Sequence, residues 1–329
     1  MIDNPGRRRI CMQALPLLLS TAPGLRAQPA AFPSQPLRLV VGFPAGGPTD
    51  VSARLIADSL SRSLGQPVVV DNRPGANATI AAEAVARARP DGYTILMAAT
   101  NHTINAVLYK SLKFDSQKSF APITEVAVAP TVLVVNPSFP ARTLAEFIAL
   151  VKASPGKYSY ASAGSGGTPH LSAEMFKQLT GTSIVHIPYR GAAPAAADLM
   201  GGQVNLYFAT LGSVLPQINA GQLRAIAVAT PARSKLLPQV PTFAESGLKD
   251  FRLDSWYGLL APAGTPKDII DRLYTETVKA VNSAAYRQRL EGAGLEPVTD
   301  SNPQKFAAQI RDEIATFGKV VRASNLTID

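Results

Sequence analysis

The chain has 329 residues, of which 46% are hydrophobic and 17% are charged, and it carries a formal net charge of +9 and a single Cys. This composition excludes a disordered chain, which needs low hydrophobicity and high charge. A disulfide scaffold is excluded as well, because one Cys has no partner within the chain. At roughly 150 residues per domain, the length predicts about two domains.

The first residues have the pattern of an export signal. Three arginines, Arg7–Arg9, precede the apolar run Ala14–Leu19, and small and turn-forming residues follow at Ser20–Gly24, ahead of Leu25-Arg26-Ala27. A basic region, a short apolar run and a small residue at the cut are typical of a secretory signal peptide, and the run is far shorter than the roughly 20 residues of a membrane span. We therefore expect residues 1–27 to be removed, with a cut a few residues later as the alternative, and the mature protein to be periplasmic. The paired arginines leave the twin-arginine export route open.

Removing this segment changes the charge. Residues 1–27 hold four of the 32 basic and one of the 23 acidic residues, so 28 and 22 remain and the net charge becomes +6. The remaining basic residues form no stripe interleaved with aromatic residues, so we expect no nucleic-acid partner. A mild positive charge favours small anions.

The mature chain begins with a β-α-β-α-β pattern. We predict strands at Leu37–Phe43, Val68–Val70 and Tyr93–Ala99, with helices at Thr49–Leu64 and Thr79–Arg89. The first helix has apolar residues at helical spacing, a Thr that can cap its start and Gly65 to close its end. This order predicts parallel strands covered by helices.

The same pattern returns in the second half. The predicted strands are Val132–Val135, Tyr158–Ser162, Ile184–Ile187, Gln203–Phe208, Leu223–Ala229 and Trp256–Ala261, and the predicted helices are Thr143–Ala153, Pro169–Leu179, Ala192–Met200, Leu211–Ala220, Lys267–Val281, Ala284–Glu291 and Pro303–Val321. Two α/β units followed by helices predict two lobes with a crevice between them.

Two loops between a strand and a helix carry the strongest functional signal. They are Phe43–Asp50 and Ala163–His170, and both are rich in Gly, Pro and small residues. Small residues let a ligand approach the backbone, and free N–H groups at a helix start favour an anion. Two such loops that face each other could hold the two ends of a diacid, although Gly and Pro also make ordinary tight turns.

Other kinds of site do not fit these residues. Gly167-Thr168-Pro169 lacks the Lys of a nucleotide-binding P-loop, and Gly164-x-Gly166 lacks the third Gly of a dinucleotide fingerprint. The three His residues are scattered and no Cys accompanies them, so we expect no metal and no cofactor. No Gly-x-Ser-x-Gly elbow is present, which disfavours hydrolysis. His186 in a strand is expected to be structural, whereas His170 in the first helical turn is a candidate cleft residue.

At these loops the sequence resembles the Bug family, the extracytoplasmic solute receptors of tripartite tricarboxylate transporters. The resemblance runs from about Phe32 to the C-terminus and rests on motifs in order: Pro36–Val41 with Phe43–Asp50, Asn72–Ala76, Pro90–Thr94, Tyr160–Gly164 with Pro169-His170, Pro188–Gly191 with Gly201–Val204, and Trp256–Pro266. It implies an α/β type II periplasmic-binding-protein fold, in which two α/β lobes are joined by two crossing strands with the ligand cleft between them. Residues 28–130 plus 255–329 would form lobe 1 and residues 131–254 lobe 2, with crossings near Ala129–Val132 and Asp254–Trp256.

The family's motifs also imply a binding site for a small carboxylate. Ala45, Gly46, Gly47, Thr49 and Asp50 would hold one carboxylate, Thr100 and Asn101 would line the same lobe, Ser162, Gly166, Thr168 and Tyr189 would hold the far end, with His170 nearby, and Phe208 would form an apolar wall. The family usually has Asp where this chain has Asn205. The change either alters ligand preference or replaces one structural hydrogen bond by another.

We therefore expect a monomeric periplasmic receptor, not an enzyme. It would capture a dicarboxylate, an amino acid or an aromatic acid and deliver it to a membrane transporter. One alternative is a ligand sensor that docks on a sensor kinase. Another is a secreted enzyme on the same scaffold, which would need a nucleophile and a base that converge in the cleft.

Overall fold

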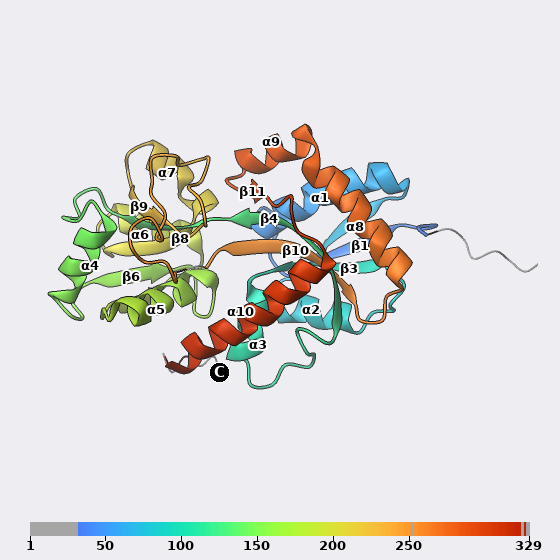
Figure 1. Cartoon of the computed structure of the whole chain (residues 1–329), viewed down its shortest axis with the longest axis horizontal. Helices are drawn as coiled ribbons and strands as arrows, with labels where there is room; N and C mark the ends of the chain where they lie inside the picture. The colour runs from blue at the N-terminus through green and yellow to red at the C-terminus, as the bar shows by residue number, and fades with distance from the viewer. Residues whose placement is uncertain (1–31, 252, 324–325, 327–329) are drawn as a thin grey trace, which may run out of the picture. The chain divides into compact units, whose positions relative to one another are not determined.

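The computed structural model of the protein describes residues 32–251, 253–323 and 326. Its strands form two mixed sheets that are flanked by helices (Figure 1). The predicted signal peptide, residues 1–27, lies outside the described residues.

The first sheet has six strands in the order β11-β4-β10-β3-β1-β2. The strands are β1 (Leu37–Val41), β2 (Val68–Asn72), β3 (Thr94–Ala99), β4 (Phe120–Ala129), β10 (Ser255–Pro262) and β11 (Glu296–Pro297). β1 pairs in parallel with β2 and β3, as the β-α-β-α-β pattern predicts, and β10 runs antiparallel to β3 and β4.

Helices cover both faces of this sheet. They are α1 (Pro48–Leu64), α2 (Thr79–Ala86), α3 (Asn101–Leu108), α8 (Lys267–Asn282), α9 (Ala284–Gly292) and α10 (Pro303–Ala323), with the short helix η1 (Ala76–Ala78) before α2. On β1, Leu39 belongs to the apolar cluster beneath α1 and α8, whereas the next residue, Val40, belongs to the cluster beneath α2 and α10. Successive side chains of a strand point to opposite faces, so one strand supplies both cores.

The second sheet has five strands in the order β7-β6-β8-β5-β9. Its strands are β5 (Thr131–Val135), β6 (Ser159–Ser162), β7 (Val185–Pro188), β8 (Leu206–Thr210) and β9 (Arg224–Val228), and its helices are α4 (Leu144–Lys152), α5 (Thr168–Thr180), α6 (Ala192–Met200), η2 (Leu211–Ser213) and α7 (Leu215–Asn219). Leu133 packs into a cluster with Phe176 of α5, and the adjacent Val134 packs into the opposite cluster with Leu199 of α6.

The chain passes between the two sheets twice. β4 ends at Ala129, Pro130 follows, and β5 starts at Thr131, while the return enters β10 at Ser255. Both passages lie where the family resemblance placed the crossing strands. The return is tied to the first sheet by Thr100, whose hydroxyl donates to the carbonyl oxygen of Asp254 at 3.1 Å and accepts from the N–H of Trp256 at 2.8 Å.

The C-terminal helix α10 packs against elements of both sheets. Its first half contributes Phe306 and Ile310 to a core of the first sheet, and its second half contributes Phe317 and Val320 to a core of the second. Gln178 of α5 donates through Nε2 to the carbonyl oxygen of Val320 at 2.9 Å. In Figure 1, α10 runs from beside β10 toward α5. A change in the angle between the sheets would therefore move this helix against one of them.

One local prediction is wrong, and some elements of the structure were not predicted. The prediction that Thr49 caps α1 is wrong, since Gly47 is the N-cap, no side chain caps it, and Thr49 lies inside the helix; Gly65 closes the helix in the left-handed conformation, as predicted. The helix α3 and most of β4 were not predicted. β4 contains Pro122, which pairs with Leu260 beside a register shift, and a sheet tolerates proline at such an irregularity.

Candidate functional site

A cleft of about 450 Å³ lies between the carboxyl ends of strands from both sheets. Loop 43–47, the start of α1 and the start of α3 line it from the first sheet, and loop 163–167 with the start of α5 lines it from the second. Among the described residues that line this cleft, none is Asp, Glu, Lys, Arg or His. Any ligand charge there must be met by backbone groups, hydroxyls and amides.

The helices α1 and α5 begin in the same way at opposite walls of the cleft. The N-cap of α1 is Gly47 with φ −79° and ψ 168°, and that of α5 is Gly167 with φ −83° and ψ 172°. No side chain hydrogen-bonds to the N-terminus of either helix, and each helix has a Pro in its first two positions. The first-turn N–H groups have no intrahelical partner, and the helix dipole is positive there. Both walls therefore favour an anionic group.

Six predicted site residues line the cleft: Ala45, Gly47, Thr49, Thr100, Asn101 and Thr168. Gly46, Asp50, Ser162, Gly166, His170, Tyr189, Asn205 and Phe208 are not among its lining residues. Most of the second group support the lining residues from behind, and their contacts show how.

Asp50 holds loop 43–47 in place. Its carboxylate accepts from the N–H of Gly46 at 2.9 Å, from Arg54 Nε at 2.9 Å and from Asn72 Nδ2 at 2.9 Å, and Asn72 Nδ2 also donates to the carbonyl oxygen of Phe43 at 3.0 Å. Burial alone would raise the pKa of Asp50, but the bonds from Arg54, Gly46 and Asn72 lower it below its ordinary value. The carboxylate of Asp50, which was predicted to hold the ligand, therefore stabilises loop 43–47 instead.

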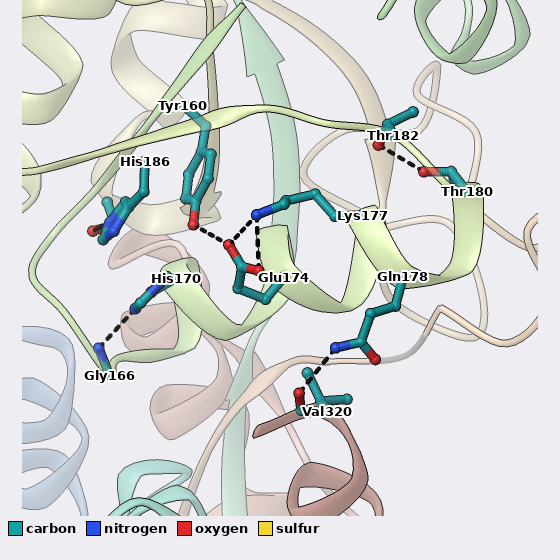
Figure 2. Close-up of polar contacts among 11 residues, drawn as sticks. Tyr160, Gly166, His170, Glu174, Lys177, Gln178, Thr180, Thr182, His186 and Val320 are labelled. Atoms are coloured by element: carbon teal, nitrogen blue, oxygen red, sulfur yellow. Dashed lines mark hydrogen bonds and ion pairs between the residues drawn. The ribbon is translucent and has the colours of Figure 1, made fainter. Parts of the chain in front are cut away.

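Loop 163–167 is held by imidazole rings that lie behind it (Figure 2). The N–H of Gly166 donates to His170 Nδ1 at 3.0 Å. His186 Nε2 lies 2.7 Å from the hydroxyl oxygen of Ser162, and that hydroxyl also donates to the carbonyl oxygen of Gly164 at 3.0 Å. His170 therefore lies next to the cleft without lining it. His186, expected to be structural, belongs to the same support.

The structure places Tyr207 at the cleft where Phe208 was predicted. Phe208 is fully buried and packs against Phe176 and Phe251 in a core of the second sheet, whereas Tyr207 lines the cleft. Adjacent residues of a strand face opposite sides of the sheet. Because Phe208 follows Tyr207 directly, its side chain lies in the core on the face opposite to that of Tyr207. The prediction that Phe208 forms the apolar wall is corrected accordingly.

Two other predicted residues, Asn205 and Tyr189, do not line the cleft. Asn205 precedes β8, and its Oδ1 accepts from the N–H of Ser159 at 2.9 Å, so it joins the amino ends of two strands whose carboxyl ends reach the cleft. Of the two interpretations of Asn205, the structure matches the structural hydrogen bond. Tyr189 donates its hydroxyl to Asp198 at 2.8 Å, and burial together with this bond raises the pKa of Tyr189 to about 12.

Several lining residues were missed by sequence reasoning: Asn77, Ala192, Tyr207, Thr210, Ser213, Ser255 and Tyr257. Thr210 ends β8, Ala192 starts α6 and Ser255 starts β10. Ligands of open α/β sheets bind at the carboxyl ends of strands, and this rule points to Thr210. No sequence pattern indicated that Asn77 lines the cleft, because its position there depends on an unusual backbone turn.

Asn77 lies in a left-handed turn at the edge of the cleft. Ala76, Asn77 and Ala78 have φ values of 44°, 51° and 72°. Asn105 Nδ2 donates to the carbonyl oxygen of Asn77 at 2.8 Å, Asn77 Nδ2 donates to Asn105 Oδ1 at 2.8 Å, and Asn101 Nδ2 donates to Asn77 Oδ1. The backbone carbonyl can only accept, which fixes the direction of every amide in this relay.

A second cavity of about 780 Å³ lies beside the crossing strands and is strongly acidic. Glu125, Asp254 and Glu313 line it together with the more exposed Asp250 and Asp312, and Lys249 is its one basic residue among those described. Burial, with the neighbouring acids adding to it, raises the pKa of Glu125 to about 8; burial raises that of Asp254 to about 7. The exposed carboxylates of Asp250 and Asp312 repel a small anion, so this cavity does not compete with the cleft for such a ligand.

Metal and membrane sites do not emerge in the described part of the chain. No three His, Cys, Asp or Glu residues within residues 32–251, 253–323 and 326 are grouped as a metal ion requires. In the same ranges no helix combines the length and apolar character needed to cross a bilayer.

Comparison with known proteins links this geometry to a family. Residues 52–326 match the model of the tripartite tricarboxylate transporter family receptor. The chain is 37% identical to protein BugT of Bordetella pertussis over 310 residues, which cover 93% of this chain and 94% of BugT.

Solved structures agree with the sequence relatives. The periplasmic binding protein BugD is 35% identical, with a TM-score of 0.76 over 90% of this chain and 99% of BugD. A Rhodopseudomonas palustris protein solved with adipate is 36% identical, with a TM-score of 0.78 over 90% of this chain and 99% of that one. The fold of this chain is thus similar to that of a protein solved with a dicarboxylate.

Proposed function

Because this chain belongs to the tripartite tricarboxylate transporter receptor family, we propose that it is an exported receptor that closes on a small dicarboxylate and presents it to a membrane transporter. One observation carries the proposal. Two uncapped helix starts, at Gly47 and Gly167, line opposite walls of a cleft that has no charged side chain among its described lining residues.

The two helix starts favour a ligand with two acidic ends. Each start attracts one anionic group, and Tyr207, Tyr257 and Ala99 also line the cleft, where they suit a short carbon chain. The adipate-bound relative has a ligand of this kind. Amino acids and aromatic acids stay within the proposed range as weaker ligands, since the described lining offers no carboxylate to an ammonium group.

Receptor function needs only binding and closure. A ligand that contacts both walls binds the closed arrangement better than the open one and shifts the population toward it. We propose that lobe 1 comprises residues 28–130 plus 255–329 and lobe 2 residues 131–254, that residues 1–27 are removed on export to the periplasm, and that the mature receptor is a monomer. Docking on the membrane subunits of the transporter is part of the same proposal.

We further propose that the protein has no catalytic activity. A hydroxyl–imidazole pair lies near the cleft, Ser162 with His186, but it is held in place by Gly164, and neither residue lines the cleft. Ser162 is fully buried, so a substrate in the cleft does not reach its hydroxyl. The pair serves the loop instead.

A matched pair of variants tests the proposal. Ala45 and Ser165 are exposed residues of the two cleft loops. Ala45→Asp places a carboxylate beside the helix start of α1, and Ala45→Asn places a neutral group of the same shape there; Ser165→Asp and Ser165→Asn do the same on the other wall. Calorimetric titration with adipate should show binding to the wild type and to both Asn variants. The Asp variants should bind roughly a hundredfold more weakly, about 2.7 kcal/mol, because a like charge replaces a favourable potential.

Two outcomes of these titrations would contradict the proposal. If dicarboxylates of four to eight carbons neither titrate nor raise the melting temperature of the wild type, the ligand class is wrong. If the Asp and Asn variants lose affinity equally, the site depends on loop shape and not on the anion-favouring potential. A diamine of the same length as adipate is the control ligand, and it should not bind.

A further inference from the structure

Two imidazole rings stack directly behind the ligand loop of the second sheet. The ring centroids of His170 and His186 are 4.0 Å apart, with 16° between the planes, and the ring of Tyr160 lies 4.8 Å from that of His186 and 6.3 Å from that of His170. His170 belongs to the first turn of α5, His186 to the edge strand β7 and Tyr160 to β6. Figure 2 shows the three rings side by side, with Gly166 at the end nearest His170.

The bond from Gly166 fixes the protonation state of His170. A backbone N–H only donates, so Nδ1 of His170 must accept and carry no proton. Gly166 has a positive φ of 78°, and it is buried, so water does not replace this bond. The neutral ring thus holds the last residue of the loop before the N-cap of α5.

His186 holds the other end of the loop through Ser162. The hydroxyl of Ser162 contacts His186 Nε2 at 2.7 Å and donates to the carbonyl oxygen of Gly164 at 3.0 Å, while the N–H of Gly164 approaches the same hydroxyl at 3.3 Å. Between these two anchors lie Gly164 and Ser165, which line the cleft. The stacked pair therefore bridges the two ends of a five-residue loop.

The charged groups around the pair do not favour a cation. Glu174 of α5 faces it, but its carboxylate accepts from Lys177 Nζ at 2.8 Å and from the hydroxyl of Tyr160 at 2.7 Å. Burial lowers the pKa of His170, although the negative charge of Glu174 acts in the opposite direction. Burial and the neighbouring His170 lower the pKa of His186 to about 4. Both rings are neutral near pH 7, and for His170 the bond from the Gly166 N–H requires an unprotonated Nδ1 as well.

We propose that His170 and His186 are positioning residues of the receptor: they fix loop 163–167 in its ligand-holding shape, through the Gly166 N–H and the Ser162 hydroxyl, without touching the ligand. This inference rests on the proposed function for its effect on affinity, but the effect on the loop is measurable without any ligand. Protonation of His170 removes the acceptor for Gly166, and two cations at 4.0 Å repel each other, so the loop loosens in acid.

The experiment compares His170→Ala with His170→Asn, and His186→Ala with His186→Gln. The Asn side chain places an acceptor oxygen near the position of Nδ1, and the Gln side chain places a polar group near that of Nε2. The ligand-free readout is amide hydrogen exchange of residues 163–167, corrected for the intrinsic effect of pH. Residues 173–178, farther along α5, serve as the internal control. The binding readout is calorimetric titration with adipate.

Both Ala variants should lose protection of the Gly164 and Gly166 amides and bind adipate roughly tenfold more weakly, as the loss of one hydrogen bond predicts. The His170→Asn and His186→Gln variants should retain most of the amide protection and most of the affinity for adipate. Protection in the wild type should fall as the pH drops from 7 to 4, and His170→Asn should flatten that profile. Unchanged protection in His170→Ala, or the same pH profile in both His170 variants, would overturn the positioning role. If protection changes as described but the wild type does not bind adipate, the loop role stands and the proposed ligand class fails.

Discussion

Asn105 donates a hydrogen bond through Nδ2 to the backbone carbonyl of Asn77, 2.8 Å away, and thereby ties the left-handed turn at residues 76–78 to the helix α3. Three successive residues without a glycine adopt positive φ there, which costs L-amino acids roughly 1–2 kcal/mol each. Strain of this kind persists where the surrounding structure fixes it, often beside a binding site. Asn77 lines the cleft, so this turn has a position that fits such a role.

Ala76→Gly should raise the free energy of unfolding by about 1 kcal/mol, because glycine adopts positive φ without the Cβ penalty. Ala76 is exposed, so little packing is lost. The matched control is Ala285→Gly in α9, an exposed helical position, where the same chemical change should cost about 0.5–1 kcal/mol. Urea unfolding of the three proteins measures both values. A loss of stability in Ala76→Gly would show that the turn is not strained.

Gly42→Ala should destabilise the protein by about 1–3 kcal/mol, because a Cβ at this position would lie 2.3 Å from the Cβ of Ala78. Both atoms belong to rigid backbone positions, so neither can move aside as a long side chain could. Ala78→Gly should recover part of that loss in the double variant, because the new Cβ would still lie 2.8 Å from the Cα of residue 78. A double-mutant cycle of urea unfolding energies measures the coupling, and additive energies would contradict this contact.

Glu125→Gln should reduce the loss of stability that accompanies rising pH. The pKa of this carboxyl rises from its ordinary 4.5 to about 8 through burial, with Glu313, Asp254 and Asp300 adding to it and Gln309 opposing it. The protonated form is favoured in the folded state, so its contribution is complete below pH 4.5 and is lost as the pH rises to about 8. The variant should be more stable than the wild type at pH 8, by a margin of the order of 2 kcal/mol, and similar to it at pH 4.5.

Urea unfolding at pH values from 4.5 to 8.5 measures this slope. Asp312→Asn is the control, because Asp312 is an exposed acid that lines the same cavity and water screens its charge. If Glu125→Gln and Asp312→Asn change the slope alike, burial is not the cause.

Phe317→Ala in α10 should cost about 3–5 kcal/mol, because the ring is buried in a core that also contains Phe176 of the second sheet. Lys319→Ala, at an exposed position one residue beyond the buried Gly318, should change stability by less than about 0.5 kcal/mol. Thermal unfolding measures both. Equal small effects would mean that α10 is anchored to the first sheet alone.

The sequence by itself determined the elements whose pattern is local. The strands that alternate with helices, the glycine end of α1 and the two Gly-rich loops follow from periodicity and turn chemistry. Those loops lie at one cleft, because they follow the carboxyl ends of β1 and β6, one from each sheet, and the cleft lies between these ends. The family resemblance added the two crossings between the sheets, which local pattern alone does not reveal.

Tertiary structure decided which side of each element meets the cleft. Tyr207 and Phe208 are both large and aromatic, and only the pairing of β8 places the first at the cleft and the second in the core. The carboxylate of Asp50 and the ring of His170 stand in motifs that resemble ligand contacts, yet each binds an N–H of its own loop. Which partner a polar side chain chooses depends on groups brought near by folding, and sequence spacing does not encode that distance. The loops were therefore predictable as a site, while the division between residues that line it and residues that support it was not.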